Sequence, residues 1–202
     1  IGKFIIKAIW EEASIGIDDK SVVNIRSENS LFKHISAKRA QLGAECFAER
    51  YIDGREFNLS ILALPDSSTG KSAPEILPPA EIIFKNYPDD KAKIVDYRAK
   101  WETDSFEYKN TERTFSFGKD DDKLLAKMKN IAIKCWKEFD LRGYARVDFR
   151  VDKKKVPYVL EINANPCISP ESGFAAALKQ AGINYKDAIN RIINDALPAE
   201  ML

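Results

Sequence analysis

Two short segments in the last third of the chain place polar side chains two residues apart. Asp148 lies between Arg146 and Arg150, and Glu161 precedes Asn163 within an otherwise apolar run. Side chains at alternate positions of a strand share one face, so each segment presents its polar groups on one side. Carboxylate and amide oxygens are hard ligands that suit Mg²⁺, and an adjacent arginine can bind phosphate or a developing oxyanion. Metal-assisted phosphate chemistry is therefore one function that this spacing would serve.

A short link joins the two segments, which predicts an antiparallel hairpin of strands at 145–151 and 157–163. If the apolar faces of both strands meet the core, each cross-strand pair joins an odd-numbered to an even-numbered residue. Asp148 then lies on the face of Glu161, where unpaired carboxylates would repel each other. A divalent cation would resolve that conflict, and so would a surface face of ion pairs with the neighbouring arginines. The hairpin by itself favours neither alternative.

Hydrophobic periodicity predicts the elements that hold this hairpin. An apolar stripe at helical spacing runs through 121–140, the clearest helix of the chain. Further helices are expected at 29–42, 172–181 and 185–197, and further strands at 4–8, 22–26, 45–51, 56–64, 81–87 and 93–97. Two polar stretches, 66–79 and 102–119, are expected to be loops, and a loop as long as the second is often functional.

Composition argues against several classes of protein. The 202 residues carry a net charge of +1, whereas a general nucleic-acid surface needs a clustered basic excess. No apolar run approaches the length of a membrane span, so we expect neither nucleic acid nor membrane as a partner. His34 is the single histidine, which argues against a histidine-based triad or a multi-histidine metal site. The cysteines, Cys46, Cys135 and Cys167, form no metal-spaced pair, and we expect reduced thiols in a cytoplasmic protein.

Two strings around the polar hairpin resemble the C-terminal signature of ATP-grasp enzymes, and most of all the D-alanine–D-alanine ligase branch. They are Gly143-Tyr144-Ala145-Arg146-Val147-Asp148-Phe149 and Leu160-Glu161-Ile162-Asn163-Ala164-Asn165-Pro166. Further segments match that family in the same order along the chain: Phe4 to Lys7, Glu11 to Gly16, Ala48 to Phe57 and Asp96 to Trp101. The resemblance runs over nearly the whole chain.

The resemblance implies a nucleotide-binding role for residues of the matched segments. ATP phosphates would be bound by Lys7 and Lys100, under a loop that contains Ser14. Adenine would be contacted by Glu49 and by the backbone near Tyr51 and Ile52, and the ribose hydroxyls by Glu56.

The resemblance also implies the residues that hold the metal and act on the substrate. Mg²⁺, or Mn²⁺ in its place, would be held by Asp148, Glu161 and Asn163. Arg146 would stabilise the phosphorylated intermediate together with Lys100, Ser172 would bind a substrate carboxylate, and backbone N–H groups near Cys167 would face the reacting carbonyl.

By the same resemblance, the chain is expected to be an ATP- and Mg²⁺-dependent ligase that joins a carboxylate to an amine. ATP would convert the carboxylate to an acyl phosphate, and the amine would then displace phosphate to give an amide or peptide bond. Such chemistry depends on phosphate positioning, charge neutralisation and exclusion of water, so the lack of a catalytic histidine is no objection. The stretch 102–118 would serve as a lid.

The fold implied is α+β, with two α/β subdomains whose mainly antiparallel sheets sandwich the nucleotide. Residues 1–52 would form a small lid subdomain, incomplete at its N-terminus, and 53–202 the catalytic subdomain. The family carries an additional N-terminal domain that completes the substrate site. We expect this chain to lack it and to bind nucleotide weakly, without catalysis, on its own. A homodimer is a possible assembly of the protein.

The substrate pocket departs from the family pattern. Ala13 stands in place of a serine, Trp101 in place of a frequent tyrosine and Cys167 in place of a glycine, while Gly173-Phe174 replaces a leucine-containing stretch. Because the ATP and metal residues match and the amino-acid pocket does not, we expect the same chemistry on a different amino-acid-like substrate. Two other interpretations are a non-catalytic nucleotide-binding or regulatory domain, and an ATP-grasp kinase or carboxylase.

Overall fold

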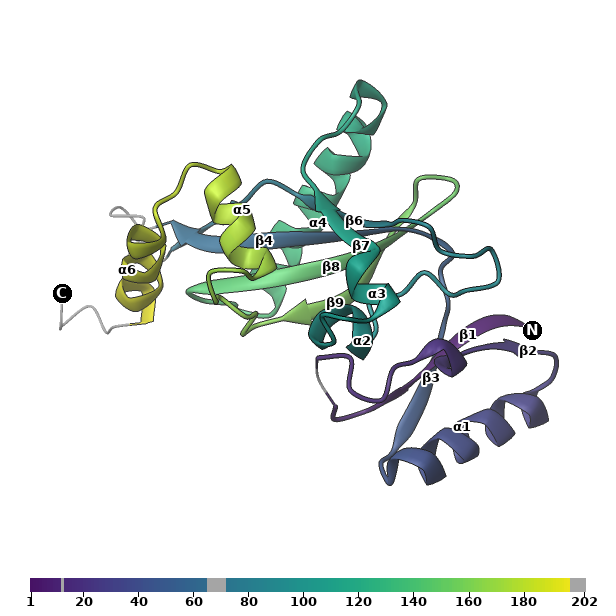
Figure 1. Ribbon diagram of the computed structural model, residues 1–202. Coiled ribbons are helices and arrows are strands. Elements are labelled where there is room, and N and C mark those ends of the chain that lie inside the picture. Colours follow the sequence, from purple (N-terminus) through teal and green to yellow (C-terminus); the bar gives the residue numbers. More distant parts are fainter. Residues whose placement is uncertain (12, 65–71, 197–202) are drawn as a thin grey trace. The chain divides into compact units, whose positions relative to one another are not determined.

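The chain folds into two compact units, each described here by itself. The computed structural model describes residues 1–11, 13–64 and 72–196 (Figure 1). The first unit comprises Ile1–Asp53 and Ile83–Glu112, and the second comprises Gly54–Ile82 and Arg113–Leu202. The segment Ile83–Glu112 thus groups with the N-terminal residues, so the two units are not consecutive along the chain.

The first unit contains an antiparallel sheet and a long helix. The sheet has the order β2-β1-β3, formed by β1 (Gly2–Ala8), β2 (Val22–Ile25) and β3 (Cys46–Arg50). Helix α1 (Glu28–Leu42) contacts all three strands. It starts where the Ser27 hydroxyl accepts the Ser30 N–H, and it ends where Gly43 adopts a left-handed φ of 65° that glycine tolerates without strain. These elements agree with the expected ones.

The rest of the first unit contains short elements that periodicity did not predict. They are the 3₁₀ turn η1 (Asp19–Ser21) and the helices α2 (Tyr97–Trp101) and α3 (Phe106–Lys109). The strand expected at 93–97 is wrong, because Asp96 instead caps α2 by accepting the Ala99 N–H at 2.8 Å. Ser105 caps α3 in the same way. Helices this short span too few residues for an apolar period to be visible.

The second unit is built on an antiparallel sheet of order β7-β6-β4-β8-β9, with β5 paired to β4. The strands are β4 (Gly54–Leu64), β5 (Ala73–Ile76), β6 (Ala80–Phe84), β7 (Thr111–Thr114), β8 (Tyr144–Asp152) and β9 (Pro157–Asn163). Strands β5 and β7 lie in stretches expected to be loops, and that expectation is wrong for both. Part of the first loop, residues 66–71, lies outside the described residues.

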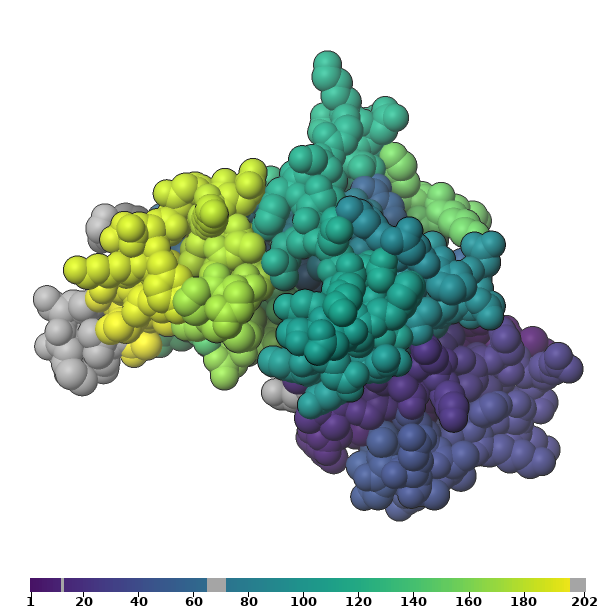
Figure 2. Space-filling model, viewed as in Figure 1, coloured from purple at the N-terminus to yellow at the C-terminus, as the bar shows by residue number. Residues whose placement is uncertain are grey.

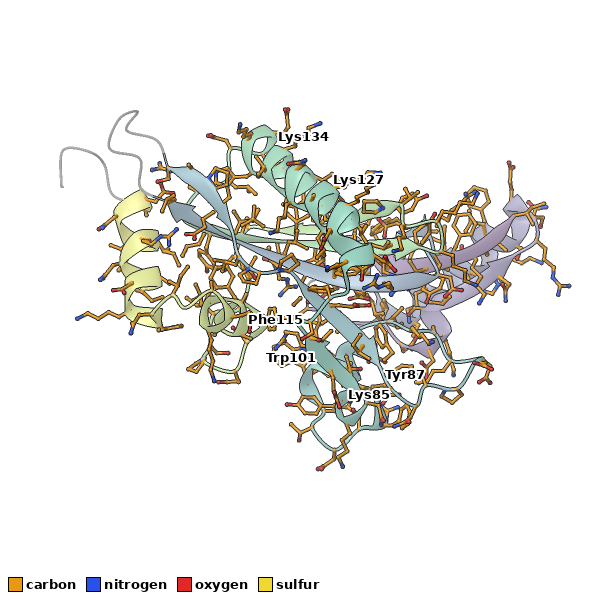
Figure 3. The ribbon with its side chains drawn as sticks, turned by 90° about the horizontal axis from the view of Figure 1, so that it is seen from above. Lys85, Tyr87, Trp101, Phe115, Lys127 and Lys134 are labelled. Atoms are coloured by element: carbon orange, nitrogen blue, oxygen red, sulfur yellow. The ribbon has the colours of Figure 1, made fainter. Side chains whose placement is uncertain are left out.

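Helix α4 (Asp122–Glu138) follows the 3₁₀ turn η2 (Lys119–Asp121) and covers one face of this sheet. Alternate residues of β4 and β8 point toward it, and the resulting core contains Phe57, Leu59, Ile61, Val147, Phe149, Leu124, Met128, Ala132 and Trp136. Lys127 and Lys134, on the opposite side of the helix, point away from the sheet (Figure 3). The stripe at helical spacing is therefore the buried face, as predicted.

Helices α5 (Gly173–Gln180) and α6 (Tyr185–Ala196) pack against β4 and against each other. Their atoms adjoin at the yellow to yellow-green surface of Figure 2. Phe174, Ala177, Leu178 and Ala188 bury their apolar faces with Leu62 of β4. Among the described residues, none of the helices is both long and apolar enough to cross a membrane.

Arg55 joins the start of β4 to β6 and to the beginning of α4. Its guanidinium donates to both carboxylate oxygens of Glu81 at 2.7 Å and to both of Asp121 at 2.8 Å. Such planar, two-pronged pairs are among the stronger charged hydrogen bonds. The hydrogen bonds from Arg55 lower the pKa of Asp121 in the folded protein.

We expect Asp121→Asn to flatten the loss of stability in acid. Because the pKa of Asp121 is lower in the folded than in the unfolded state, its stabilisation is present above the unfolded value of about 3.9. That stabilisation is lost as the pH falls through the lower, folded value. Urea unfolding midpoints measured between about pH 2.5 and 6 should fall less steeply for Asp121→Asn than for the wild type. Identical pH profiles would contradict the assigned role of the Arg55–Asp121 pair.

Candidate active site

The hairpin of β8 and β9 has the register that parity predicted at its site end. Arg146 pairs with Asn163 and Asp148 pairs with Glu161, so an even-numbered residue faces an odd-numbered one in each pair. An irregularity between Asp148 and Phe149 shifts the register beyond this point. The polar groups of the two strands therefore share one face, and the two carboxylates are direct cross-strand neighbours.

Strand β4 extends this polar face on the other side of β8. Its residues Glu56, Asn58 and Ser60 are the partners of Arg150, Asp148 and Arg146 in the antiparallel ladder. The opposite face of the same strand carries the apolar residues that pack against α4. Sequence reasoning missed Asn58 and Ser60, although their alternation with Phe57, Leu59 and Ile61 was a usable signal.

Asp148 is the centre of the hydrogen bonds on this face. It is 6% exposed, and its two carboxylate oxygens accept from Nε and Nη2 of Arg146, both at 2.7 Å. Asn58 Nδ2 donates to the same carboxylate at 2.8 Å. Burial alone would lower the pKa of Arg146, but the charge and hydrogen bonds of Asp148, with the charges of Glu161 and Glu56, raise it. Arg146 therefore stays positively charged in a partly buried position.

The ion-pair alternative for this face is present in part. Besides the Arg146–Asp148 pair, Arg150 donates to Glu56 at 3.0 Å, and both side chains are buried. Glu161 differs, because it is exposed and makes no hydrogen bond or ion pair with any other described residue. Ion pairing thus accounts for Asp148, while Glu161 is solvent-exposed and interacts with Arg146 only through its charge.

The donor set on this face fits a divalent cation in its chemistry. Asp148, Glu161 and Asn163 offer hard oxygen atoms from adjacent strands. The side-chain oxygen of Asn163 is oriented by the Asn165 N–H, which donates to it at 2.9 Å. Because Asp148 and Glu161 are direct cross-strand neighbours, one cation could contact both carboxylates. The structure brings together all three residues predicted to hold the metal.

The chain after β9 leads to the start of α5. Ser172 lies there as the N-cap of the helix, and its hydroxyl accepts the Ala175 N–H at 3.2 Å. Cys167 is exposed, and its sulfur lies 3.2 Å from the Ser169 hydroxyl. Sequence reasoning missed Arg113, whose guanidinium lies against Gly173 at the same helix end.

In the first unit, the predicted phosphate and adenine residues Lys7 and Glu49 form an ion pair. Lys7 is on β1 and Glu49 on the adjacent β3, with Nζ and Oε2 2.5 Å apart. Alternation places both on the sheet face opposite Ile6, which is 2% exposed. The structure thus places these two predicted residues together on one face of the sheet.

The loop after β1 has an unusual backbone at the predicted phosphate-covering segment. Ala13 and Ser14 both have left-handed backbones, with φ of 55° and 65°. The Ser14 hydroxyl donates to the Val95 carbonyl at 2.8 Å, and Trp101 Nε1 donates to the Ala13 carbonyl at 3.3 Å. Non-glycine residues in this region are strained and persist only where contacts hold them. Glu12 lies outside the described residues.

The other predicted nucleotide residues are dispersed within their units. Lys100 is in α2 and half-buried, and Glu56 is buried on β4 of the second unit. Tyr51 and Ile52 follow β3, and the Tyr51 N–H donates to the Lys3 carbonyl at 3.0 Å. A polar cavity of about 610 Å³ in the first unit is lined by Lys3, Asn24 and Tyr51 among others, but not by Lys7, Glu49 or Lys100.

Comparison with solved structures defines the class of the fold. The D-alanine–D-alanine ligase from Bacillus anthracis superimposes with a TM-score of 0.65 at 23% identity, over 96% of this chain and 54% of that one. The VanG D-Ala:D-Ser ligase from Enterococcus faecalis gives a TM-score of 0.64 at 15% identity, over 96% and 50%. The fold is therefore the α+β ATP-grasp fold, as the resemblance implied.

Comparison of sequences then gives the family. Residues 4–194 match the family model of the D-ala D-ala ligase C-terminus, and the chain belongs to that family. A D-alanine–D-alanine ligase from Carboxydothermus hydrogenoformans is 32% identical over 190 residues, which is 94% of this chain and 53% of that protein. An uncharacterised protein from Sinorhizobium fredii is 31% identical over 81% of this chain and 44% of its own length. The chain thus spans about half the length of the curated relatives it matches.

Proposed function

We propose that the protein is an ATP- and Mg²⁺-dependent ligase that forms an amide or peptide bond through an acyl phosphate. The observation that carries this proposal is the face on which Asp148, Glu161 and Asn163 converge beside Arg146. A decayed, non-catalytic domain has no need of a partly buried arginine next to two carboxylates. Membership of the ligase family supports the same chemistry.

The proposal assigns a role to each of the predicted nucleotide-binding, metal-binding and phosphoryl-binding residues. A bound Mg²⁺ would neutralise phosphate oxygens, and Asp148, Glu161 and Asn163 would hold it. Arg146, kept positively charged by Asp148, would bind the phosphoryl oxygens as they gain charge. Lys7 and Lys100 would bind phosphates. Ser14 would cover them, Glu49 with the backbone near Tyr51 and Ile52 would contact adenine, and Glu56 would contact the ribose hydroxyls.

The reaction proposed transfers the γ-phosphoryl group to a carboxylate oxygen of the acid substrate, and ADP leaves. The amine nitrogen then attacks the carbonyl carbon, the bond from that carbon to the bridging oxygen breaks, and inorganic phosphate leaves while the nitrogen loses its proton. Ser172 and the backbone near Cys167 would orient the substrate, with the Ser172 hydroxyl already aligned by its cap on α5. Positioning and charge stabilisation supply most of the rate enhancement in such transfers.

We also propose that the substrate differs from D-alanine. Ala13 lacks the hydroxyl that the family carries in its loop, and Gly173 lies beneath an arginine instead of contributing a side chain. One solved relative of the same fold is a D-Ala:D-Ser ligase, which supports variation at the second substrate. The reaction would take place in the cytoplasm. An additional N-terminal domain would complete the substrate site. A homodimer is one assembly that measurement of the molecular mass in solution would test.

The test is phosphate release by full-length protein incubated with ATP, Mg²⁺ and a panel of D- and L-amino acids, singly and in pairs. We expect release above the ATP-only background with at least one combination other than D-alanine, and an amide product of matching mass. Robust turnover with D-alanine alone would contradict the proposed difference in substrate. Nucleotide binding without release in any combination would contradict the ligase and favour the non-catalytic interpretation.

We expect Lys7→Met to weaken ATP binding. The change removes the positive charge that Glu49 holds at the sheet surface. A hydrogen bond to a charged group is worth about 1.5–3 kcal/mol, so KM for ATP should rise about tenfold to 100-fold. The matched control is Lys33→Met on the exposed side of α1, which should leave KM unchanged. An unaltered KM for ATP in Lys7→Met would remove Lys7 from the phosphate site.

A further inference from the structure

Arg113 of β7 lies directly against the start of α5. A Cβ atom placed on Gly173 would be 3.2 Å from Arg113 Nη2, 3.5 Å from Cζ and 3.6 Å from Nε. Three guanidinium atoms at such similar distances mean that the planar group lies broadside over Gly173. Phe115, two residues further on, packs in the cluster of Phe174, and Figure 3 shows it beside this helix. The segment around β7 thus points its side chains at α5.

The charge of Arg113 is not neutralised within the described part of the chain. The guanidinium makes no hydrogen bond or ion pair with any described residue, whereas the neighbouring Arg146 is held by both oxygens of Asp148. Arg113 is exposed on β7, and desolvation by its neighbours together with the nearby charge of Arg146 lowers the pKa of Arg113. An arginine remains protonated under these conditions, so a solvent-accessible positive charge lies beside the first turn of α5.

The position of Gly173 allows this arrangement. Any side chain at that position would meet the guanidinium at closer than ordinary van der Waals distance. The lack of a side chain at Gly173 thus leaves room for the guanidinium of Arg113 against the start of α5.

We infer that Arg113 recognises a negatively charged group on the side chain of the amino-acid substrate. This inference deepens the proposed function and rests on it, because it assigns the substrate class: an amino acid with a second carboxylate. The expected partner of a planar guanidinium is a carboxylate bound through two parallel hydrogen bonds. Arg113 would therefore be a specificity-determining residue that binds the substrate away from the reacting carboxyl group.

Two other occupants of this position are less consistent with the contacts. The phosphoryl group is expected at Arg146 and the metal-binding residues of β8 and β9, whereas Arg113 lies on the side of Gly173 and Ser172. Structural arginines of this chain such as Arg55 and Arg191 have a carboxylate or carbonyl partner. Arg113 is exposed and has no such partner among the described residues, so its guanidinium is accessible to a ligand.

The experiment compares acids with their uncharged amides. Binding of D- and L-aspartate, asparagine, glutamate and glutamine to full-length protein is measured by calorimetry with Mg²⁺ and a non-hydrolysable ATP analogue. The variants are Arg113→Gln, Arg113→Lys and, as a control with the same change of charge, Arg26→Gln in the exposed turn before α1. We expect at least one acid to bind the wild type about tenfold or more tightly than its amide, which is about 1.4 kcal/mol.

Arg113→Gln should abolish this preference, Arg113→Lys should keep part of it, and Arg26→Gln should leave it unchanged. The inference would be overturned if the wild type bound every acid and its amide equally. It would also be overturned if the wild type bound none of them, or if the preference survived in Arg113→Gln. Phosphate release with ATP is measured separately. An acid that binds through Arg113 without release in any combination would contradict the ligase alone, and the role of Arg113 would stand.

Discussion

Asp148→Asn is expected to reduce ATP-dependent product formation by about 10²–10³-fold, the usual cost of removing a group that stabilises charge in the transition state. The substitution removes one of two cross-strand carboxylates and half of the two-pronged pair that positions Arg146. One change therefore affects both the proposed metal-binding face and the arginine proposed to bind the phosphoryl group. The measurement is kcat for phosphate release with saturating ATP and Mg²⁺.

The control separates this effect from loss of the fold. Asp187→Asn makes the same chemical change on the exposed side of α6, and its kcat should match the wild type. Glu161→Gln should resemble Asp148→Asn in activity while leaving the Arg146 pair in place. If Asp148→Asn turns over at the wild-type rate while its circular dichroism is unchanged, the metal-binding face is not where the chemistry occurs.

Phe149→Ala is expected to destabilise the second unit by about 3–5 kcal/mol, the range observed when a buried phenylalanine is truncated. Phe149 is fully buried in the core between the sheet and α4, and it pairs with Phe57 across β4 and β8. Its neighbours on the strand, Asp148 and Arg150, point to the opposite, polar face. The same strand thus anchors the core and presents the site, and activity should fall together with stability.

The matched control is Phe139→Ala just after α4, where the side chain is 65% exposed. That change should alter stability by no more than about 0.5 kcal/mol. The measurement for both variants is the urea dependence of unfolding, followed by tryptophan fluorescence. Equal destabilisation by the two substitutions would show that Phe149 is not part of a close-packed core.

The polar face of β8 and β9 could be predicted because two strong constraints act on it. Period-two alternation fixes which residues of β8 and β9 share a face, and burial of Phe149 and Val147 fixes which face is inward. Pairing of even-numbered residues of β8 with odd-numbered residues of β9 then places Asp148 on the same face as Glu161. The irregularity after Asp148 could not be predicted, since no glycine or proline marks it.

Other parts depend on contacts between segments far apart in the sequence. Arg113 joins the start of α5 from a polar stretch without a period, and its neighbour Gly173 is 60 residues away. Asn58 of β4 donates to Asp148, which is 90 residues further along the chain. The α2 and α3 helices depend on caps by Asp96 and Ser105 rather than on apolar periodicity. The contacts of Arg113 and Asn58 follow from tertiary packing, whereas the alternation around Asn58 and the caps of α2 and α3 are local signals too weak to be decisive alone.

The acyl phosphate is the central claim, and an oxygen label tests it most directly. The amino acid that supports phosphate release is prepared with ¹⁸O in both carboxylate oxygens and incubated with full-length protein, ATP, Mg²⁺ and the amine. Because the bridging oxygen of an acyl phosphate comes from the acid, each released phosphate should carry one ¹⁸O atom in mass spectrometry. Released phosphate without label, with or without an amide product, would contradict the acyl-phosphate route.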